Sequence, residues 1–177
     1  MAKLEGKKIL MIIASNGFRD EELQVPKGIF EREGAKVTLA CSSLKQSKGM
    51  LGATAKPDVL IGDVKVEDYD AVIFVGGSGA SEYWNDKKAH EIARATLEKG
   101  KLLGAICIAP VTLANAGVLQ GKKATVYSSE AGKLGQKGAI YTGTGVEIDG
   151  SIITADGPQS AKEFGEAFVN ALAKPTE

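Results

Sequence analysis

The sequence has few residues of the two types that most often bind metals. Cys41 and Cys107 are the two cysteines, and His90 is the one histidine among 177 residues. Two cysteines do not make the disulfide framework of a small secreted protein. Two cysteines and one histidine also fall short of a zinc-site pattern. We therefore expect neither a structural disulfide nor a metal centre.

An excess of charge of either sign is also absent. Lysine plus arginine and aspartate plus glutamate each number 22, so the formal net charge is zero. This balance gives no electrostatic support for binding nucleic acid or an anionic membrane surface. The longest strongly apolar run, residues 9–14, is too short to span a bilayer, and charged residues 19–22 follow it at once, unlike in a signal peptide. We expect a cytoplasmic protein with no nucleic-acid or membrane partner.

The glycine-rich motifs of nucleotide-binding proteins are incomplete. Gly77 and Gly79 follow an apolar run, but Glu82 stands where the dinucleotide fingerprint has its third glycine, and no Walker sequence occurs. The loop after the first apolar run carries three acids, residues 20–22, which would repel phosphate. We therefore expect no cofactor. The glycines predict either a tight turn or a close approach of the Gly77 amide to Cys107.

The chain is long enough for one domain with a full core and too short for two ordinary ones. We therefore expect a single domain over residues 1–177. Short apolar runs alternate with helical patterns, which indicates an α/β fold with a mostly parallel sheet and helices on both sides. Strands are predicted at 8–14, 36–41, 59–61, 71–75, 102–106, 124–127, 146–148 and 152–154. Helices are predicted at about 22–34, 86–99, 110–116, 129–134 and from 160 onward.

Three local signals refine these elements. Pro26 is tolerated only near a helix start, so the first turn of the first helix is predicted at residues 22–26. Asp149-Gly150 predicts a hairpin between the last two strands. Ser160 and Glu163 have the spacing of a capping box at the start of the last helix.

The stretch around Cys107 is typical of a nucleophile elbow. The cysteine stands at the end of a buried strand, and Pro110 then opens a helix. In parallel sheets, sites form at the carboxyl ends of the strands. The three loops predicted at that edge are residues 15–22, 76–79 and 107–110. A buried packing cysteine is the alternative interpretation, and position alone does not separate the two.

A partner for the Cys107 thiol is more readily found among carboxylates than in an imidazole. His90 falls off the apolar face of its helix and is predicted to be a solvated surface residue. A carboxyl group can serve only if it keeps its proton and donates a hydrogen bond to the thiolate. Amides near Ile108 and Ala109 would favour the thiolate further. The candidate acids are Asp20, Glu21 and Glu22, each of which is also an ordinary acid for a helix start.

For three other residues, the sequence is consistent with either a packing role or a role in the site. Cys41 ends a predicted strand, and a buried packing role is favoured for it. Tyr127 and Trp84 are candidates for lining the cleft, and they are equally well explained as core or surface aromatics.

Across nearly its whole length the sequence resembles the ThiJ/PfpI family. The motifs that carry the resemblance are Ala105–Pro110, Asp20–Leu23 with Pro26, Gly76-Gly77, Gly117–Leu119 with Gly121–Lys123, Asp149-Gly150 and Asp156–Pro158. Each motif is weak alone, and together they are specific. The resemblance implies a flavodoxin-like three-layer sandwich that assembles as a homodimer.

The resemblance also implies which residues form the site. It pairs Cys107 as nucleophile with Glu22, and it assigns the oxyanion site to the amides of Gly77 and Ile108. Gly76, Tyr127 and Asp156 are further candidates for the pocket.

The functions implied are those of a deglycase or glutathione-independent glyoxalase, with a small aldehyde or a glycated molecule as substrate. An oxidation-sensing stress protein or chaperone is the alternative. An intracellular peptidase is disfavoured, because Ile108 stands where such members have histidine and Arg19 stands where they have glutamate.

Overall fold

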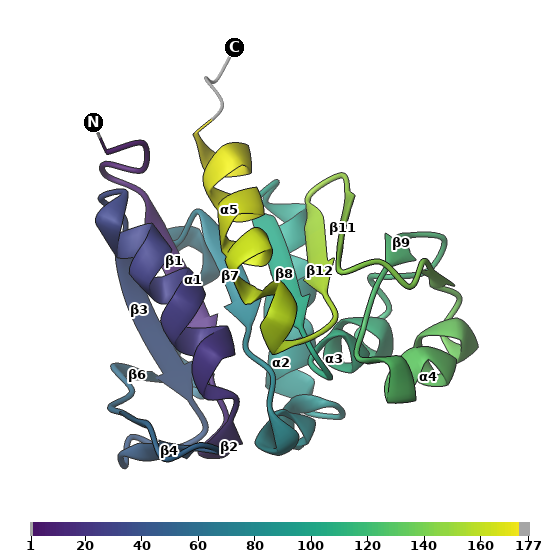
Figure 1. The fold of residues 1–177 in the computed structure, drawn as a ribbon, viewed down its shortest axis with the longest axis horizontal. Helices are drawn as coiled ribbons and strands as arrows, with labels where there is room; N and C mark the ends of the chain where they lie inside the picture. Colours follow the sequence, from purple (N-terminus) through teal and green to yellow (C-terminus); the bar gives the residue numbers. More distant parts are fainter. Residues whose placement is uncertain (1, 174–177) are drawn as a thin grey trace.

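A seven-stranded sheet runs through the middle of the molecule in this computed structural model, which describes residues 2–173 (Figure 1). The strand order is β11-β12-β8-β7-β1-β3-β6. Neighbouring strands are parallel except for the β11–β12 pair, which is antiparallel. The strands are β1 Lys8–Ile12, β3 Lys36–Cys41, β6 Val59–Leu60, β7 Ala71–Phe74, β8 Leu102–Ile106, β11 Val146–Asp149 and β12 Ile152–Ala155.

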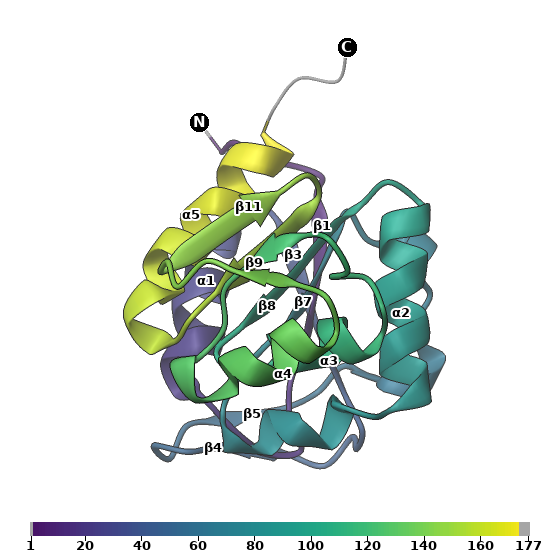
Figure 2. The ribbon, with the colours of Figure 1, turned by 90° about the vertical axis from the view of Figure 1, so that its right-hand side faces the viewer.

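Helices cover both faces of this sheet (Figure 2). Helices α1 (Asp20–Arg32) and α5 (Ala161–Leu172) lie together on one face. Helices α2 (Lys87–Glu98) and α3 (Pro110–Asn115) cover the other face, and α4 (Ala131–Gln136) packs on α3. The predicted α/β, flavodoxin-like three-layer fold is confirmed. None of the helices in the described part of the chain is long and apolar enough to cross a membrane.

Two small sheets flank the main one. Strands β2 (Asn16–Phe18), β4 (Ser47–Gly49) and β5 (Thr54–Ala55) form one. Strands β9 (Lys123–Ala124) and β10 (Ile140–Tyr141) form the other. The strand predicted over residues 124–127 is therefore shorter and earlier than expected, because the chain beyond Ala124 turns toward the elbow.

The core on the α1/α5 face depends on the packing of aromatic side chains against a glycine of strand β8. Phe164 and Phe168 of α5 meet edge to face with ring centroids 5.2 Å apart, and Phe30 of α1 contacts Phe168 in the same way. Gly104 of β8 lies directly beneath the Phe168 ring, where an added methyl group would overlap with it. The absence of a side chain at Gly104 lets α5 lie close to the sheet.

Two expectations for the helices were wrong. Helix α1 begins at Asp20, so Pro26 lies in its second turn, where it packs against Gly165 of α5 and cannot donate to the carbonyl of Glu22. The Ser160 hydroxyl forms no capping box, because it donates instead to Asp156 Oδ1 at 2.7 Å.

The predicted hairpin is confirmed, with its turn one residue later than expected. Asp149 pairs with Ile152 across the two strands, so Gly150 and Ser151 form the turn. Gly150 has a φ of 61°, the left-handed conformation that glycine adopts without strain.

Gly104→Ala should destabilise the protein by about 1–3 kcal/mol, because the new methyl group forces Phe168 off its position. Urea unfolding measures the change. Gly135→Ala is the matched control: this residue is exposed on α4 and has open space around it, so it should be neutral or stabilise by up to about 1 kcal/mol. Equal effects of the two substitutions would contradict the packing argument.

Candidate active site

Three loops meet at the carboxyl edge of adjacent strands β1, β7 and β8. The first loop leads from β1 into α1, and the first turn of α1 carries Glu22. The second follows β7 and contains Gly76 and Gly77. The third follows β8 and contains Cys107 and Ile108. Helix α1 covers one face of the sheet while α2 and α3 cover the other, so the loops converge where the chain changes sides.

Cys107 has a strained backbone. Its φ is 66°, and among residues 2–173 it is the one residue other than glycine with a positive φ. This left-handed conformation costs a residue with a side chain about 1–2 kcal/mol. Neighbours hold it in place: the Cys107 amide donates to Ala155 O at 2.9 Å, and the Tyr127 amide donates to Cys107 O at 2.8 Å. The tight turn aims the thiol at the edge of the sheet.

The Glu22 carboxyl lies beside the Cys107 thiol and is completely buried. An added methyl group at Gly76 would overlap both with Glu22 Oε1 and with the Cys107 side chain, so both of these groups lie against the Cα atom of Gly76. The expected approach of the Gly77 amide to Cys107 is also found, because this amide acts on the Cys107 sulfur. Among the described residues, neither carboxyl oxygen of Glu22 has a hydrogen bond of ordinary geometry.

Burial sets the protonation of Glu22. Removal from water raises the pKa of this carboxyl from 4.5 to about 8, and the opposing effects of Cys107, Arg19 and the Gly76 amide are smaller. Glu22 therefore keeps its proton at neutral pH, which is the state in which it can donate a hydrogen bond to sulfur.

The Cys107 thiol is less acidic than the sequence indicated. Burial, followed by the negative charge of ionised Glu22, raises its pKa to about 12, while the amides of Gly77 and Ile108 lower it. The Ala109 amide makes no such contribution, since it donates to Ile106 O at 3.1 Å. When Glu22 holds its proton, its repulsive charge is absent and only burial opposes the thiolate. The two groups are therefore best treated as a pair that shares protons.

Two backbone amides near the Cys107 sulfur have no backbone hydrogen-bond acceptor in the described part of the chain. Among residues 2–173, the amides of Gly77 and Ile108 donate to no backbone carbonyl, and both favour a negative charge on Cys107. Gly77 has a φ of 108°, and a side chain there would overlap with the backbone at Arg19. The two amides provide donors for negative charge that develops beside the sulfur.

The other two acids in the first turn of α1 have different partners. Asp20 accepts hydrogen bonds from the amides of Leu51 at 3.0 Å and Ala53 at 2.9 Å, and these lower its pKa although burial opposes them. Glu21 forms a two-bond ion pair with Arg19, at 2.9 and 3.0 Å. Of the three acids, only Glu22 lies beside Cys107. Residue type and spacing did not distinguish the three, whereas the family resemblance implied Glu22.

The remaining predicted residues are placed as follows. Tyr127 reaches the site through its backbone amide, and the residue is 46% exposed. Asp156 follows β12 next to the elbow, and its carboxylate accepts from Ser160. His90 was expected to be solvated, but it is half-buried and its Nε2 donates to Trp84 O at 2.8 Å. Cys41 is fully buried, as its packing interpretation predicted.

Sequence reasoning missed one contact of the elbow. The Trp84 indole Nε1 donates to Ile108 O at 3.1 Å, which links the loop after β7 to the cysteine turn. No local signal places that side chain, because the two residues are 24 positions apart.

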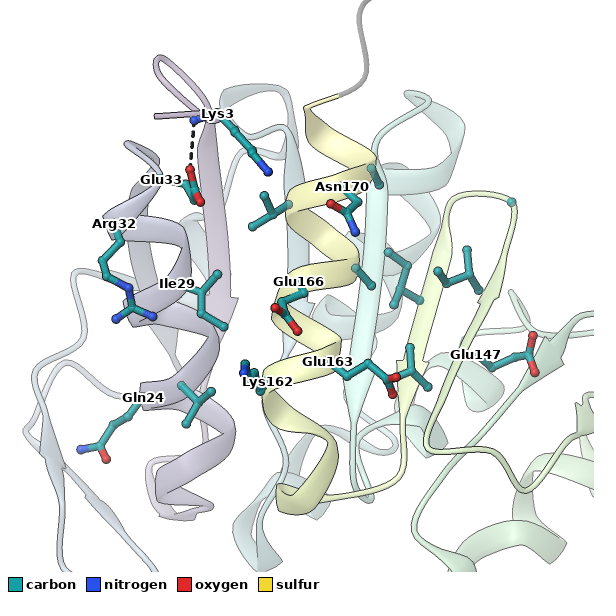
Figure 3. Close-up of a pocket in the computed structure, with 18 residues that line it drawn as sticks. Lys3, Gln24, Ile29, Arg32, Glu33, Glu147, Lys162, Glu163, Glu166 and Asn170 are labelled. Carbon is teal, nitrogen blue, oxygen red and sulfur yellow. Dashed lines mark hydrogen bonds between the residues drawn. The ribbon is translucent and has the colours of Figure 1, made fainter. Parts of the chain in front are cut away.

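A large groove lies away from these loops (Figure 3). It has a volume of about 1160 Å³ and runs between α1, α5 and the β11–β12 hairpin. Neither Cys107 nor Glu22 lines it, so the groove and the cysteine site are separate places.

The fold defines an α/β protein with a strained cysteine turn at the end of β8, and comparison identifies its family. The model of the DJ-1/PfpI family matches residues 7–171. The chain belongs to the DJ-1/PfpI family.

Relatives in three organisms illustrate the range of this family. An uncharacterized protein of Methanocaldococcus jannaschii is 42% identical over 98% of this chain and 86% of its own length. The glutathione-independent glyoxalase DJR-1.2 of Caenorhabditis elegans is 30% identical over 96% of this chain and 90% of its own length. Deglycase PfpI of Pyrococcus furiosus is 29% identical over 92% and 98%, respectively.

A solved structure matches the fold along almost the whole chain. The ThiJ/PfpI domain protein from Brachyspira murdochii superimposes with a TM-score of 0.94, at 32% identity, over 97% of this chain and 100% of that one.

The raised pKa of Glu22 predicts that Glu22→Gln becomes increasingly stabilising as pH rises. Below pH 4.5 the carboxyl is protonated in both folded and unfolded chains. Between pH 4.5 and 8 only the unfolded chain ionises, so the wild type loses stability that glutamine, which does not titrate, keeps. The difference in free energy of unfolding should grow by about 2–4 kcal/mol across this range.

Urea unfolding at pH 4.5, 6 and 8 checks this prediction. Glu31→Gln is the control, because Glu31 is exposed on the same helix. A Glu22→Gln difference that stays constant with pH would contradict a buried protonated carboxyl.

Proposed function

We propose that this protein is a cysteine-dependent enzyme that acts on reactive dicarbonyls or on their adducts, as a deglycase or a glutathione-independent glyoxalase. The observation that carries the proposal is the pair of Cys107 and protonated Glu22 beside the uncommitted amides of Gly77 and Ile108. The names of the relatives from Pyrococcus furiosus and Caenorhabditis elegans support this reaction class.

In the first step, the Cys107 thiol loses its proton to solvent, and the thiolate Sγ adds to the aldehyde carbon of a substrate such as methylglyoxal. The aldehyde oxygen gains negative charge next to the amides of Gly77 and Ile108, which require no rearrangement to stabilise it. The Glu22 carboxyl then delivers its proton to this oxygen and becomes a carboxylate. The product of the step is a neutral hemithioacetal beside a base.

In the second step, the Glu22 carboxylate removes the proton from the former aldehyde carbon and returns it to the adjacent carbon. Together with a shift of the hydroxyl proton to the neighbouring carbonyl oxygen, this transfer converts the hemithioacetal into its isomer, a thioester of lactate. The Glu22 carboxylate then takes a proton from water, and the hydroxide attacks the thioester. Lactate leaves, one proton passes to solvent, and the Cys107 thiolate and protonated Glu22 are restored. Glu22 serves first as an acid and then as a base, and its pKa of about 8 makes both states accessible near neutral pH.

Cys107→Ser and Glu22→Gln should each lower lactate production from methylglyoxal by about a hundredfold or more, because each removes one half of the pair. An enzymatic lactate assay measures the rate. Cys41→Ala is the control, since the buried Cys41 thiol contacts Ser47 and Tyr83 rather than Cys107 or Glu22, and it should retain wild-type turnover. Wild-type rates in both site variants would refute the proposal and reveal a contaminating glyoxalase.

A second candidate is an oxidation-sensing stress protein or chaperone. It is favoured by one observation: Cys107 is partly exposed, whereas Cys41 is buried. Peroxide would oxidise the thiolate to sulfenic and then sulfinic acid. Protonated Glu22 could then donate a hydrogen bond to the sulfinate.

Mild peroxide should add two oxygens to the wild type and none to Cys107→Ser, as measured by intact mass, with the peptide containing Cys107 carrying the whole gain. An unmodified wild-type protein, or oxidation at Cys41 instead, would count against the sensor.

The peptidase activity, the domain organisation, the assembly and the location of the protein are further expectations from the sequence. The peptidase has little support, because the His90 ring is bonded to Trp84 rather than directed at Cys107. A single domain over residues 1–177, homodimeric assembly and a cytoplasmic location remain predictions. The active site proposed here needs no metal or cofactor for the steps described.

A further inference from the structure

The backbone of the cysteine turn is held by bonds from several parts of the chain. The carbonyl of Cys107 accepts from the Tyr127 amide at 2.8 Å. The carbonyl of Ile108 accepts from the Val111 amide at 3.2 Å and from Trp84 Nε1 at 3.1 Å. In the described part of the chain, Trp84 supplies the one side-chain hydrogen bond to the backbone of residues 107–109. It is the contact of this turn that substitution can remove.

Trp84 is itself firmly placed by three helices. Its carbonyl accepts from His90 Nε2 of α2 and from Asn115 Nδ2 of α3, both at 2.8 Å. Lys133 Nζ of α4 lies 5.3 Å from the centre of its ring, in cation–π geometry. Because the backbone carbonyl of Trp84 is hydrogen-bonded and its indole ring is covered, this residue can act as a rigid anchor for the turn.

The anchored turn is the one that carries a proposed oxyanion donor. The Ile108 amide lies between the Cys107 and Ile108 carbonyls, and both of these are bonded. Because the amide has no backbone acceptor of its own among residues 2–173, its direction is set by the bonds that the carbonyls on either side of it accept. Donors contribute to catalysis only when they are already aimed at the developing charge.

We infer that Trp84 is a positioning residue: its indole N–H, by holding the Ile108 carbonyl, keeps the Ile108 amide aimed at Cys107. The inference deepens the proposed function and uses the same site. Its first test is the reactivity of the thiol toward iodoacetamide, which requires only Cys107 and does not depend on the substrate.

Trp84→Phe should slow alkylation of Cys107 by about tenfold at pH 8, because the thiolate loses a well-aimed donor, and the rate should rise only at higher pH. Peptide mass spectrometry assigns the modified cysteine. His90→Ala is the matched control. It removes one of the two side-chain hydrogen bonds to the Trp84 backbone carbonyl, while the bond from Asn115 and the indole N–H remain. Its rate should stay within twofold of the wild type.

A second variant removes the donor without a change of shape. Trp84 is the only tryptophan in the sequence, so expression in a tryptophan auxotroph supplied with benzothienylalanine replaces this one N–H by sulfur. This protein should reproduce the slow alkylation of Trp84→Phe even if the phenylalanine variant fails to fold. A wild-type alkylation rate with benzothienylalanine, or an equal loss in His90→Ala, would overturn the inference.

Turnover gives the second readout. With methylglyoxal as substrate, the benzothienylalanine protein should show a kcat about tenfold lower and a KM within twofold of the wild type, since the donor acts on developing charge. If the benzothienylalanine protein is alkylated slowly but the wild type does not turn over methylglyoxal, the proposed function is refuted and the positioning role stands. Normal alkylation with normal turnover would refute the positioning role alone.

Discussion

The site depends on the burial of one carboxyl group against one thiol. Glu22 is fully removed from water, so it is stable there only when it is neutral, and its pKa rises to about 8 as a result. A neutral carboxyl can donate to sulfur, whereas a charged one would repel the thiolate. Burial of Glu22 therefore lowers the stability of the folded protein above pH 4.5, and it holds a proton beside the Cys107 thiol.

The rest of the molecule is arranged so that these two groups can meet. Gly76 has no side chain, and any side chain there would separate Glu22 from Cys107. Cys107 tolerates a left-handed backbone because bonds to Ala155 and Tyr127 hold it. Strain of this kind persists only where the surroundings determine the conformation strongly. The amides of Gly77 and Ile108 then have no backbone acceptor within the described residues and lie beside the sulfur.

Much of the scaffold could be predicted, because its signals are local. The buried strands and the helix beginning at Pro110 follow from apolar runs and from the conformational limits of proline. Errors arose where a distant contact overrode a local preference. Pro26 is accommodated within α1 through its packing on Gly165, and Ser160 bonds to Asp156 instead of capping its helix.

The sequence by itself determined the α/β class, the position of Cys107 at the end of a buried strand and the set of three acids that could serve it. These follow from periodicity and from residue type, which are properties of short segments. The family resemblance implied Glu22, but local signals did not, and the tertiary structure places Glu22 beside Cys107 while Asp20 and Glu21 bind other partners. Only the tertiary structure decided that Trp84 reaches the turn and that the thiol is made less acidic by burial. These features depend on which surfaces are removed from water and which loops meet, and both are fixed only when the strands assemble into the sheet.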